Sequence, residues 1–306
     1  MPTRRAALST LALLVNPPSA HADASNAELA SYYERHAALI DGVAYGWVGR
    51  GEPRRLREGA RQVGVRQIGV SRDAFFALLA DATLVTWGEQ PGPVTTLQRG
   101  VASFAAGATG WFAIDAGGAL WHSNGGAAAQ RVAHDVASAC IGDGADYFIT
   151  RDGRLHVKGL AHRGQYGDGR LTASEHFIVT ATDALAVRAH TGHAIYLQRD
   201  GSAWGTGGNR FGPLGAHGLG DKADRWGRIF DGAVAIATGS RHSVAIREDG
   251  GLWAWGEGFA IAPAKIMDQV AAVAAGDTAT IARTRDGALW QWDAGGAPRR
   301  LKLAPP

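Results

Sequence analysis

Short runs of alternating apolar and polar residues cover most of the chain, and turns rich in Asp and Gly separate them. The clearest stretch, Ala235 to Gly256, has one run that ends at Gly239, a second run before the turn Asp249-Gly250, and a third run with Trp253 and Trp255. Alternation with a period of two predicts half-buried β-strands. Asp-Gly between two such strands favours a hairpin with a type I′ turn, in which both central residues need a positive φ.

The same frame occurs seven times along the chain. Each copy has two apolar runs, a turn and a third run that in most copies carries Trp, and the turns lie at residues 41, 81, 117, 152, 200, 249 and 286. Four copies continue into a short strand led by proline, at Pro53, Pro93, Pro263 and Pro298. Proline is tolerated at the start of an outer strand because its missing N–H interrupts no ladder there. Each copy is therefore predicted to form four short strands.

Repeated four-stranded units predict the blades of a β-propeller, because a single blade cannot bury its own faces and must stack on its neighbours. The predicted fold is all-β, a seven-bladed β-propeller of four-stranded antiparallel blades over residues 36–306. Strands such as Ala274-Ala275-Gly276 would be innermost, where only small side chains fit, and the Trp strands would fill the wedges between blades. Ser25 to Glu28 resembles a capping box, which predicts a short N-terminal helix over 23–35 and leaves six blades as an alternative.

The recurring residues resemble the regulator-of-chromosome-condensation repeat family. The motifs that match its unit are Gly239, His242-Ser243, Asp249-Gly250 and Trp255-Gly256, together with the Gly-rich loops at 164–169 and 209–215. The resemblance spans residues 36–303 and implies a seven-bladed propeller. The family includes a nuclear exchange factor for a small GTPase, and also exported inhibitors of β-lactamases that grip their target with loops on one face. This chain is similar to those inhibitors in size, in repeat type and in its predicted export.

The first 22 residues are predicted to form an export signal. A basic head with Arg4 and Arg5 precedes an apolar run of about ten residues, which is too short to span a bilayer. Ala20-His21-Ala22 fits the small-residue rule for cleavage. We therefore expect a signal peptide over 1–22 and a periplasmic or secreted protein without a membrane span. Thr3-Arg4-Arg5 partly fits a twin-arginine signal, so twin-arginine export and general secretion both stay open.

Charge and cysteine content narrow the class of partner. Without Arg4 and Arg5, 29 basic residues face 28 acidic ones, and no basic stripe is present, so we expect no nucleic acid partner. Cys140 is the single cysteine, so no disulfide and no cysteine-based metal site can form within the chain. We expect a monomer that binds another protein.

No motif with catalytic chemistry stands out in the sequence. The nucleophile elbow, the zinc-binding helix, the phosphate loop and the calcium loop are all missing, and Asp200 and Asp249 fall on predicted turns. His190 and His193 do not share a helical face, and His193 has the same repeat position as His242, where a structural hydrogen bond is simpler than a metal. We therefore expect no enzyme, no metal and no cofactor.

Two connections are longer than the rest, from Ala161 to Ala184 and from Asn209 to Gly232. Loops on a rigid scaffold carry recognition, and aromatic residues mixed with Arg are typical of interfaces. The candidate binding residues in these connections are His162, Arg163, Gln165, Tyr166, Arg210, Phe211, Arg225, Trp226 and Arg228. The alternative is that these glycine-braced loops pack on the neighbouring blades.

Three functions stay open at this stage. The first is an exported protein-binding scaffold, similar to the inhibitors in its mode of binding. The second is a cell-wall or glycan binder, which would stack exposed Trp or Tyr rings on sugars. The third is an enzyme, which would need His, Asp and Glu to converge at one end of the axial channel.

Overall fold

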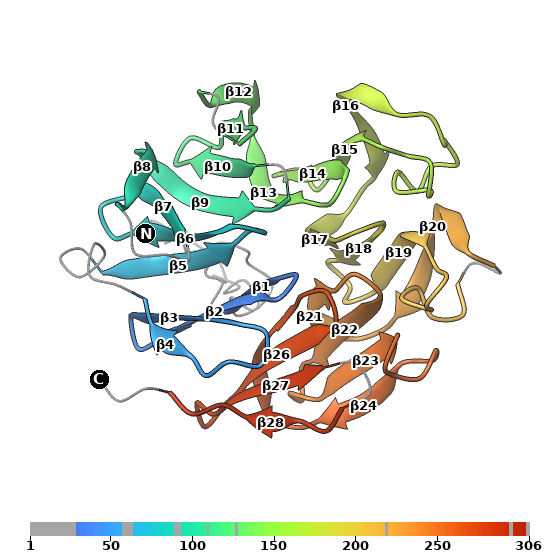
Figure 1. The fold of residues 1–306 in the computed structure, drawn as a ribbon. Coiled ribbons are helices and arrows are strands. Elements are labelled where there is room, and N and C mark those ends of the chain that lie inside the picture. Colours follow the sequence, from blue (N-terminus) through green and yellow to red (C-terminus); the bar gives the residue numbers. More distant parts are fainter. Residues whose placement is uncertain are drawn as a thin grey trace, which may run out of the picture.

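The fold is a ring of seven antiparallel sheets, each made of four consecutive strands (Figure 1). The computed structural model describes residues 29–56, 64–88, 93–108, 110–125, 128–217, 220–293 and 296–303. The predicted seven-bladed β-propeller is confirmed, and the alternative of six blades is wrong. The predicted signal peptide over 1–22 lies outside the described residues.

The blades follow one another along the chain, and each begins with its innermost strand. The strands of the first four blades are β1 (Leu29–Tyr32), β2 (Arg35–Ile40), β3 (Val43–Val48), β4 (Arg54–Arg55), β5 (Val65–Val70), β6 (Ala74–Leu79), β7 (Leu84–Gly88), β8 (Thr95–Gln98), β9 (Val101–Ala106), β10 (Trp111–Asp115), β11 (Leu120–Ser123), β12 (Gln130–Ala133), β13 (Val136–Ile141), β14 (Ala145–Thr150), β15 (Leu155–Gly159) and β16 (Ser174–Ala181). The strands of the last three are β17 (Ala184–Ala189), β18 (His193–Gln198), β19 (Ala203–Gly208), β20 (Lys222–Phe230), β21 (Ala233–Thr238), β22 (His242–Arg247), β23 (Leu252–Gly256), β24 (Ala264–Met267), β25 (Val270–Ala275), β26 (Ala279–Thr284), β27 (Leu289–Asp293) and β28 (Arg299–Arg300).

The predicted helix over 23–35 is wrong where the structure describes it. Leu29–Tyr32 forms β1, which pairs antiparallel with β2 through Leu29↔Ala38 and Ser31↔His36. Tertiary pairing outweighs local helix propensity here, because β1 completes the first blade and buries Leu29 and Tyr32. The propeller therefore begins by residue 29 and not at 36. The capping-box residues 25–28 lie outside the described part of the chain.

The innermost strands surround an axial cavity of about 450 Å³. Alanine is the commonest residue in its lining, as in Ala235–Thr238 of β21 and Ala271–Ala275 of β25, and Arg188 and Arg283 also line it. Small residues are needed because seven strands approach the axis together. In blades two to seven the pairing of the innermost strand with its neighbour shifts register once, which marks a repeated β-bulge.

Tryptophans of the third strands fill the wedges between blades, as predicted. Trp255 is fully buried, stacks on Phe230 of the preceding blade at 5.6 Å between ring centroids, and donates its indole N–H to the carbonyl of Pro213 at 2.7 Å. Trp292 is also buried in the cluster between the last two blades. The indole is therefore a packing element in these copies.

The Asp-Gly turns differ from the predicted type I′. Only the turn at Asp41-Gly42 has two residues with positive φ, at 50° and 75°. In the turn at Asp152-Gly153 only Gly153 is left-handed, and its N–H donates to the carbonyl of Thr150 at 2.8 Å. This is a type I turn followed by a left-handed glycine. It forms because the Asp152 side chain accepts a hydrogen bond from the Arg154 N–H, which stabilises ordinary φ at the aspartate.

The ring closes by packing of the first blade on the last. Leu29 and Trp47 share a hydrophobic cluster with Ile281 and Leu301, and the Trp47 indole donates to the Gln291 side chain at 3.1 Å. Among the described strands, each sheet contains only its own consecutive members, so the first and last blades meet through side-chain packing.

Candidate functional site

Antiparallel strands place two sets of loops on one side of the ring. The connections between first and second strands and between third and fourth strands open on this side, which we call the loop face, and the Asp-Gly turns open on the other. Both long connections lie on the loop face: residues 160–173 join β15 to β16, and residues 209–221 join β19 to β20. The candidate binding residues can therefore be examined on one surface.

Two of the predicted binding residues are interior, so their prediction as contact residues is wrong. Tyr166 is fully buried, and its hydroxyl donates to the Gly159 carbonyl at 2.6 Å and accepts from the Ser174 N–H at 2.8 Å. The buried Gln165 side chain accepts a hydrogen bond from the Arg163 N–H at 2.8 Å. These two side chains shape the loop from inside.

The 160–173 loop rests on the next blade. Its Gly169 N–H donates to the Asp224 carbonyl at 2.8 Å, and the Trp226 N–H donates to the Gly167 carbonyl at 2.9 Å. The indole of Trp226 is half-buried and meets the ring of Tyr196 edge-on at 4.8 Å. Trp226 is therefore held between the loop and the blade, as the packing alternative predicts.

The 209–221 loop rests on the following blade in the same way. Leu214 is fully buried, and the carbonyl of Pro213 accepts hydrogen bonds from Ser243 Oγ at 2.8 Å and from the Trp255 indole at 2.7 Å. Asn209 holds the loop closed, because its side chain donates to the His217 carbonyl and accepts from the Leu214 N–H. Both long loops are thus fixed to the ring.

Phe211 stays at the surface of this braced loop. Its ring is 40% exposed and lies under the guanidinium of Arg241 at 4.6 Å and beside that of Arg210 at 5.6 Å. Glu257 holds Arg241 through two contacts of 3.1 Å. Phe211 is therefore presented in one orientation by its charged neighbours.

Ile261 adds a second exposed apolar side chain, which the sequence analysis missed. It is 65% exposed and lies close to Gly212, where an added Cβ would be 3.5 Å from the Ile261 side chain. We call Phe211, Ile261, Arg210 and Arg241 the Phe211 patch. Sequence alone gave no reason to prefer Ile261, since its loop between β23 and β24 has ordinary length.

The remaining predicted residues divide between the two sides of the molecule. His162 and Arg163 are exposed on the loop face, where Arg163 donates to the Thr191 carbonyl at 3.5 Å. Arg225 is exposed beside Gly169. Arg228 lies near the far end of β20 and pairs with Asp231 at 2.5 Å, away from the loop face. The structure thus brings most, but not all, of the predicted residues to one surface.

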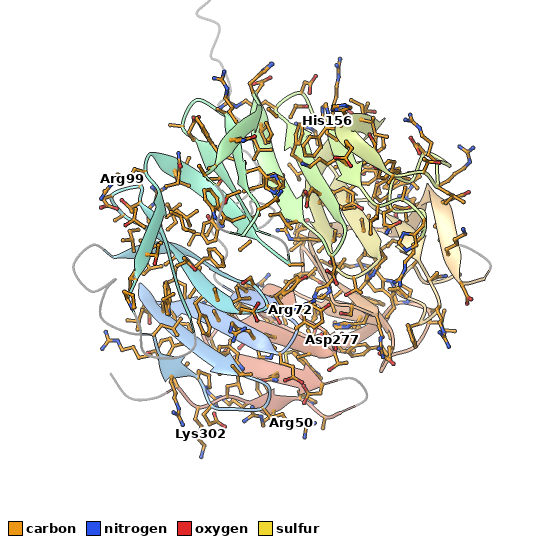
Figure 2. The ribbon with its side chains drawn as sticks, turned by 45° about the horizontal axis from the view of Figure 1, so that its top comes forward. Arg50, Arg72, Arg99, His156, Asp277 and Lys302 are labelled. Atoms are coloured by element: carbon orange, nitrogen blue, oxygen red, sulfur yellow. The ribbon has the colours of Figure 1, made fainter. Side chains whose placement is uncertain are left out.

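A second polar group of residues surrounds the axis on the same face. One residue from each loop between first and second strands takes part, and we call these seven residues the axial mouth: Tyr33, Arg72, Ala108, Asp143, Thr191, Ser240 and Asp277. Backbone hydrogen bonds link several of these loops to the next blade, for example from Ser240 N–H to the Gly276 carbonyl at 3.1 Å. Figure 2 shows Arg72 and Asp277 near the centre of the ring.

Tyr33 reaches across the mouth from the first blade to the fourth. Its hydroxyl donates to Asp143 Oδ2 at 2.8 Å and accepts from Arg72 at 3.2 Å, and the Arg72 guanidinium also lies over its ring at 4.9 Å. The backbone of Tyr33 is left-handed, with φ of 49°. Arg72 and Asp143 are therefore joined through one phenol.

Tyr32 and His190 replace glycine below this bridge. Blades three, four, six and seven have glycine at the equivalent position, for example Gly239, where an added Cβ would collide with His242, and blade two has Ser71. The two rings stack across the axis at 4.8 Å, and burial lowers the pKa of His190 to about 4 against the opposing effect of nearby carboxylates. The absence of the recurring glycine at residues 32 and 190 is the sequence signal that could have revealed the mouth.

A catalytic site would need His, Asp and Glu side chains to converge at one end of the channel, and the axial mouth meets only part of this requirement. His190 Nδ1 lies 3.1 Å from Ser240 Oγ and 2.8 Å from Thr191 Oγ1, and Asp143 and Asp277 are at the same end of the channel. Within the described residues, however, His190 Nε2 has no hydrogen-bond partner, so no carboxylate orients the imidazole as a triad requires. His193, by contrast, bonds to Ser243 Oγ at 3.1 Å and so has the structural role predicted for it.

Several other site types have little support in the described part of the chain. None of the ten Trp residues, all of which are described, is exposed, so no indole is displayed for stacking on a sugar. No group of three or more His, Cys, Asp or Glu side chains with metal-binding geometry occurs among the described residues. The same residues contain no helix long and apolar enough to cross a membrane.

One segment of the chain is similar to a known repeat family. Residues 233–259 match the model of the regulator of chromosome condensation (RCC1) repeat. The ultraviolet-B receptor UVR8 of Arabidopsis thaliana is 28% identical over 122 residues, which cover 36% of this chain and 27% of the receptor. The match therefore spans about a quarter of that relative's length.

Solved structures share the architecture at low sequence identity. Prp20p from Saccharomyces cerevisiae, described with its binding properties to Gsp1p and histones, superposes with a TM-score of 0.70 at 15% identity, covering 81% of this chain and 80% of that one. The ectodomain of the receptor kinase ACR4 from Arabidopsis thaliana gives 0.59 at 15% identity, covering 91% and 98%. These likenesses show the fold alone. The chain is thus a seven-bladed β-propeller that is similar to RCC1-type propellers in its fold and, over residues 233–259, in its repeat.

Proposed function

We propose that this protein is an exported scaffold that binds another protein through the loop face of its fourth to sixth blades. The observation that carries the proposal is the Phe211 patch, in which Phe211 and Ile261 are exposed and two arginines pack on the Phe211 ring. Propellers of this type are commonly interaction scaffolds, and the yeast protein of the same fold binds other proteins. The comparison supports the class of function and not the identity of the partner.

The chemistry of the patch supports a protein partner. Aromatic and arginine side chains supply a large share of binding energy at interfaces because they bury much surface and can pair with charge at once. Phe211 offers its ring edge between Arg210 and Arg241, and Ile261 lies beside it. Arg163, Arg210 and Arg225 pair with no carboxylate of a described residue, so a partner could supply one.

The rigidity of the loops also favours binding. Loops that are already ordered lose less conformational entropy when a partner binds. The 160–173 and 209–221 loops are fixed by backbone hydrogen bonds and by buried Tyr166 and Leu214, so the exposed residues are presented without prior rearrangement. The buried residues thus act in binding only by supporting the surface.

Export is part of the proposal and rests on the sequence of the first 22 residues. Mass spectrometry of the protein purified from its native host tests this directly. We expect a mature chain that begins at Asp23 and is recovered from the periplasm or the medium. Recovery of the chain with Met1 from the cytosol would contradict export.

The binding proposal is tested by surface variants that leave the interior intact. The partner is first identified by affinity purification with the wild-type protein, and its Kd is then measured for the double variant Phe211→Ala, Ile261→Ala. We expect at least tenfold weaker binding, equivalent to about 1.4 kcal/mol or more, with an unchanged Tm. The matched control is Glu248→Ala on the opposite face, which should keep the wild-type Kd. Equal Kd values for both variants would refute the proposal.

A further inference from the structure

Three polar groups at the loop-face end of the axial cavity have no hydrogen-bond partner among the described residues. Two of them are buried, Nε2 of His190 and the hydroxyl of Tyr32, and the third is the half-buried carboxylate of Asp277. His190 and Tyr32 are only 4% and 5% exposed, so water outside the protein does not reach their polar atoms. Buried polar atoms of this kind are usually paired, because an unpaired one costs about 1–3 kcal/mol.

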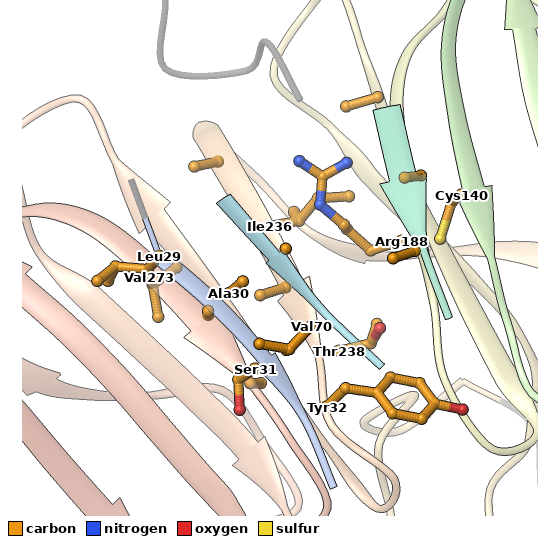
Figure 3. A pocket seen from close by; sticks show the side chains of 18 of the residues that line it. Leu29, Ala30, Ser31, Tyr32, Val70, Cys140, Arg188, Ile236, Thr238 and Val273 are labelled. Carbon is orange, nitrogen blue, oxygen red and sulfur yellow. The ribbon is translucent and has the colours of Figure 1, made fainter. Parts of the chain in front are cut away.

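The three groups belong to one place in the structure. The rings of His190 and Tyr32 stack at 4.8 Å, and both residues line the axial cavity. The N–H of Asp277 donates to the carbonyl of Tyr33 at 3.1 Å, and Asp277 is the carboxylate with the largest effect on the pKa of His190. Figure 3 shows the Tyr32 phenol at the opposite end of this pocket from the guanidinium of Arg188.

The neutral imidazole of His190 can offer Nε2 as an acceptor. Burial keeps the imidazole neutral, so only one of its nitrogens carries a proton. Nδ1 lies 2.8 Å from Thr191 Oγ1 and 3.1 Å from Ser240 Oγ, and either hydroxyl can accept a proton from it or donate one to it. In the tautomer with the proton on Nδ1, Nε2 has a free lone pair, and this is the tautomer that a bound donor would select.

Of the two carboxylates at the mouth, Asp277 is the one without a positively charged neighbour among the described residues. Asp143 is already linked to the Arg72 guanidinium through the Tyr33 hydroxyl. Asp277 is half-buried and has no cation among the described residues. A water molecule could complete the hydrogen bonds of His190 and Tyr32, but it brings no positive charge to pair with Asp277.

From this arrangement we propose that the axial mouth binds a primary ammonium group, held by Asp277, by His190 Nε2 and by the Tyr32 hydroxyl oxygen. An ammonium group has three N–H donors and one positive charge, and the site has three acceptors and one unpaired negative charge. The ammonium can come from a free small amine or from a lysine side chain of a bound protein. The lysine source rests on the proposed function, whereas the free amine does not.

Propylammonium chloride is the probe, and the ¹⁵N signal of His190 Nε2 is the readout. Titrations are made at constant ionic strength with NaCl, and n-propanol serves as the uncharged probe of the same shape. We expect saturable binding of propylammonium that is at least about tenfold tighter than that of n-propanol, because the charge-assisted hydrogen bonds need the cation. A Nε2 signal that does not respond, or an equal response to n-propanol, would show that water alone fills the site.

Two carboxamide variants locate the charge that binds the probe. Asp277→Asn removes the charge and keeps the shape, and it should weaken propylammonium binding about tenfold. Asp73→Asn removes an exposed charge from a neighbouring loop of the same face and should change binding less than about twofold. Equal weakening by both variants would mean that propylammonium responds only to the general negative charge of this face. That result would refute the proposed site at Asp277. The wild-type comparison of the two probes needs neither variant, so it decides the question even if Asp277→Asn does not fold.

The same variant separates the two sources of ammonium. If a partner lysine enters the mouth, Asp277→Asn weakens partner binding, and propylammonium competes with the partner. If the partner binds equally well to Asp277→Asn, a free amine is the source. Failure of the Phe211 patch variants to affect partner binding would refute the proposed function but leave the amine titration unchanged, so the two failures can be told apart.

Discussion

Aromatic side chains have two opposite roles in this propeller, since some pack in the interior and others are exposed at the surface. Trp255 is fully buried and bonded to Pro213, whereas Phe211, in the same loop as Pro213, is 40% exposed. Tyr166 was an attractive contact residue by composition, yet both hydrogen bonds of its hydroxyl are satisfied inside the loop. Burial and hydrogen bonding, which the sequence does not specify, decide which aromatic residues are available to a partner.

Replacement of Trp255 by alanine tests the wedge packing. Removing the indole leaves a cavity beside Phe230 and an unpaired carbonyl at Pro213, so we expect Trp255→Ala to lower the free energy of unfolding by about 3–5 kcal/mol. Chemical denaturation measures this loss. Ile261→Ala is the surface control, with an expected change within about 0.5 kcal/mol. A Trp255→Ala protein as stable as the wild type would refute the buried position.

At the level of elements, the long loops brace the ring and carry the patch at the same time. The 160–173 loop bonds along the start of β20, and the 209–221 loop packs under β23 through Pro213 and Leu214. Glycine is needed where these contacts are closest. At Gly167, with φ of 70°, an added Cβ would collide with the indole of Trp226.

Gly167→Ala tests the bracing of the first loop. The methyl group would displace Trp226 and strain a left-handed backbone, so we expect a loss of about 2–4 kcal/mol in the free energy of unfolding. Gly287→Ala is the matched control, because it has a similar φ of 84° but nothing within 4 Å of the added Cβ. The control should show only the backbone cost of about 1 kcal/mol. Equal losses would mean that the loop does not depend on contact with Trp226.

Most of the elements were predictable from the sequence, because alternation, turn residues and small-residue strands repeat in every copy. The four strands per blade and the innermost Ala-rich strands are confirmed. β1 was missed because its own residues favour a helix, and only pairing with β2 makes it a strand. The site was less predictable: the loops could be located, but the interior position of Gln165 and Tyr166 and the exposure of Ile261 depend on packing between blades.

The whole molecule is predicted to be sensitive to acid because of its buried histidines. Burial lowers the pKa of His36, His122, His190 and His242 to about 4 and that of His193 to about 3. Below the ordinary pKa of about 6.5 the unfolded chain binds protons that the folded protein does not, so stability falls as the pH falls from about 6.5 to about 4. Asp146, with its pKa raised to about 6 by burial, acts in the opposite direction but is one group against five.

Denaturant unfolding at several pH values between about 7.5 and 5 measures this effect. We expect the free energy of unfolding to fall by several kcal/mol over this range, since each of the five imidazoles contributes up to about 1.4 kcal/mol per pH unit. His193→Gln should reduce the slope, whereas His176→Gln, at an exposed position, should not. A free energy that stays constant down to about pH 5 would contradict the buried neutral state of these histidines.

Site-specific photo-crosslinking tests the central claim, that a partner protein binds the loop face through the Phe211 patch. A photoreactive phenylalanine is placed at residue 211 or, on the opposite face, at residue 248, and each protein is irradiated with the purified partner. The account predicts a covalent complex from residue 211 and none from residue 248. Crosslinking from residue 248 alone would place the binding surface on the Asp-Gly turns and contradict it.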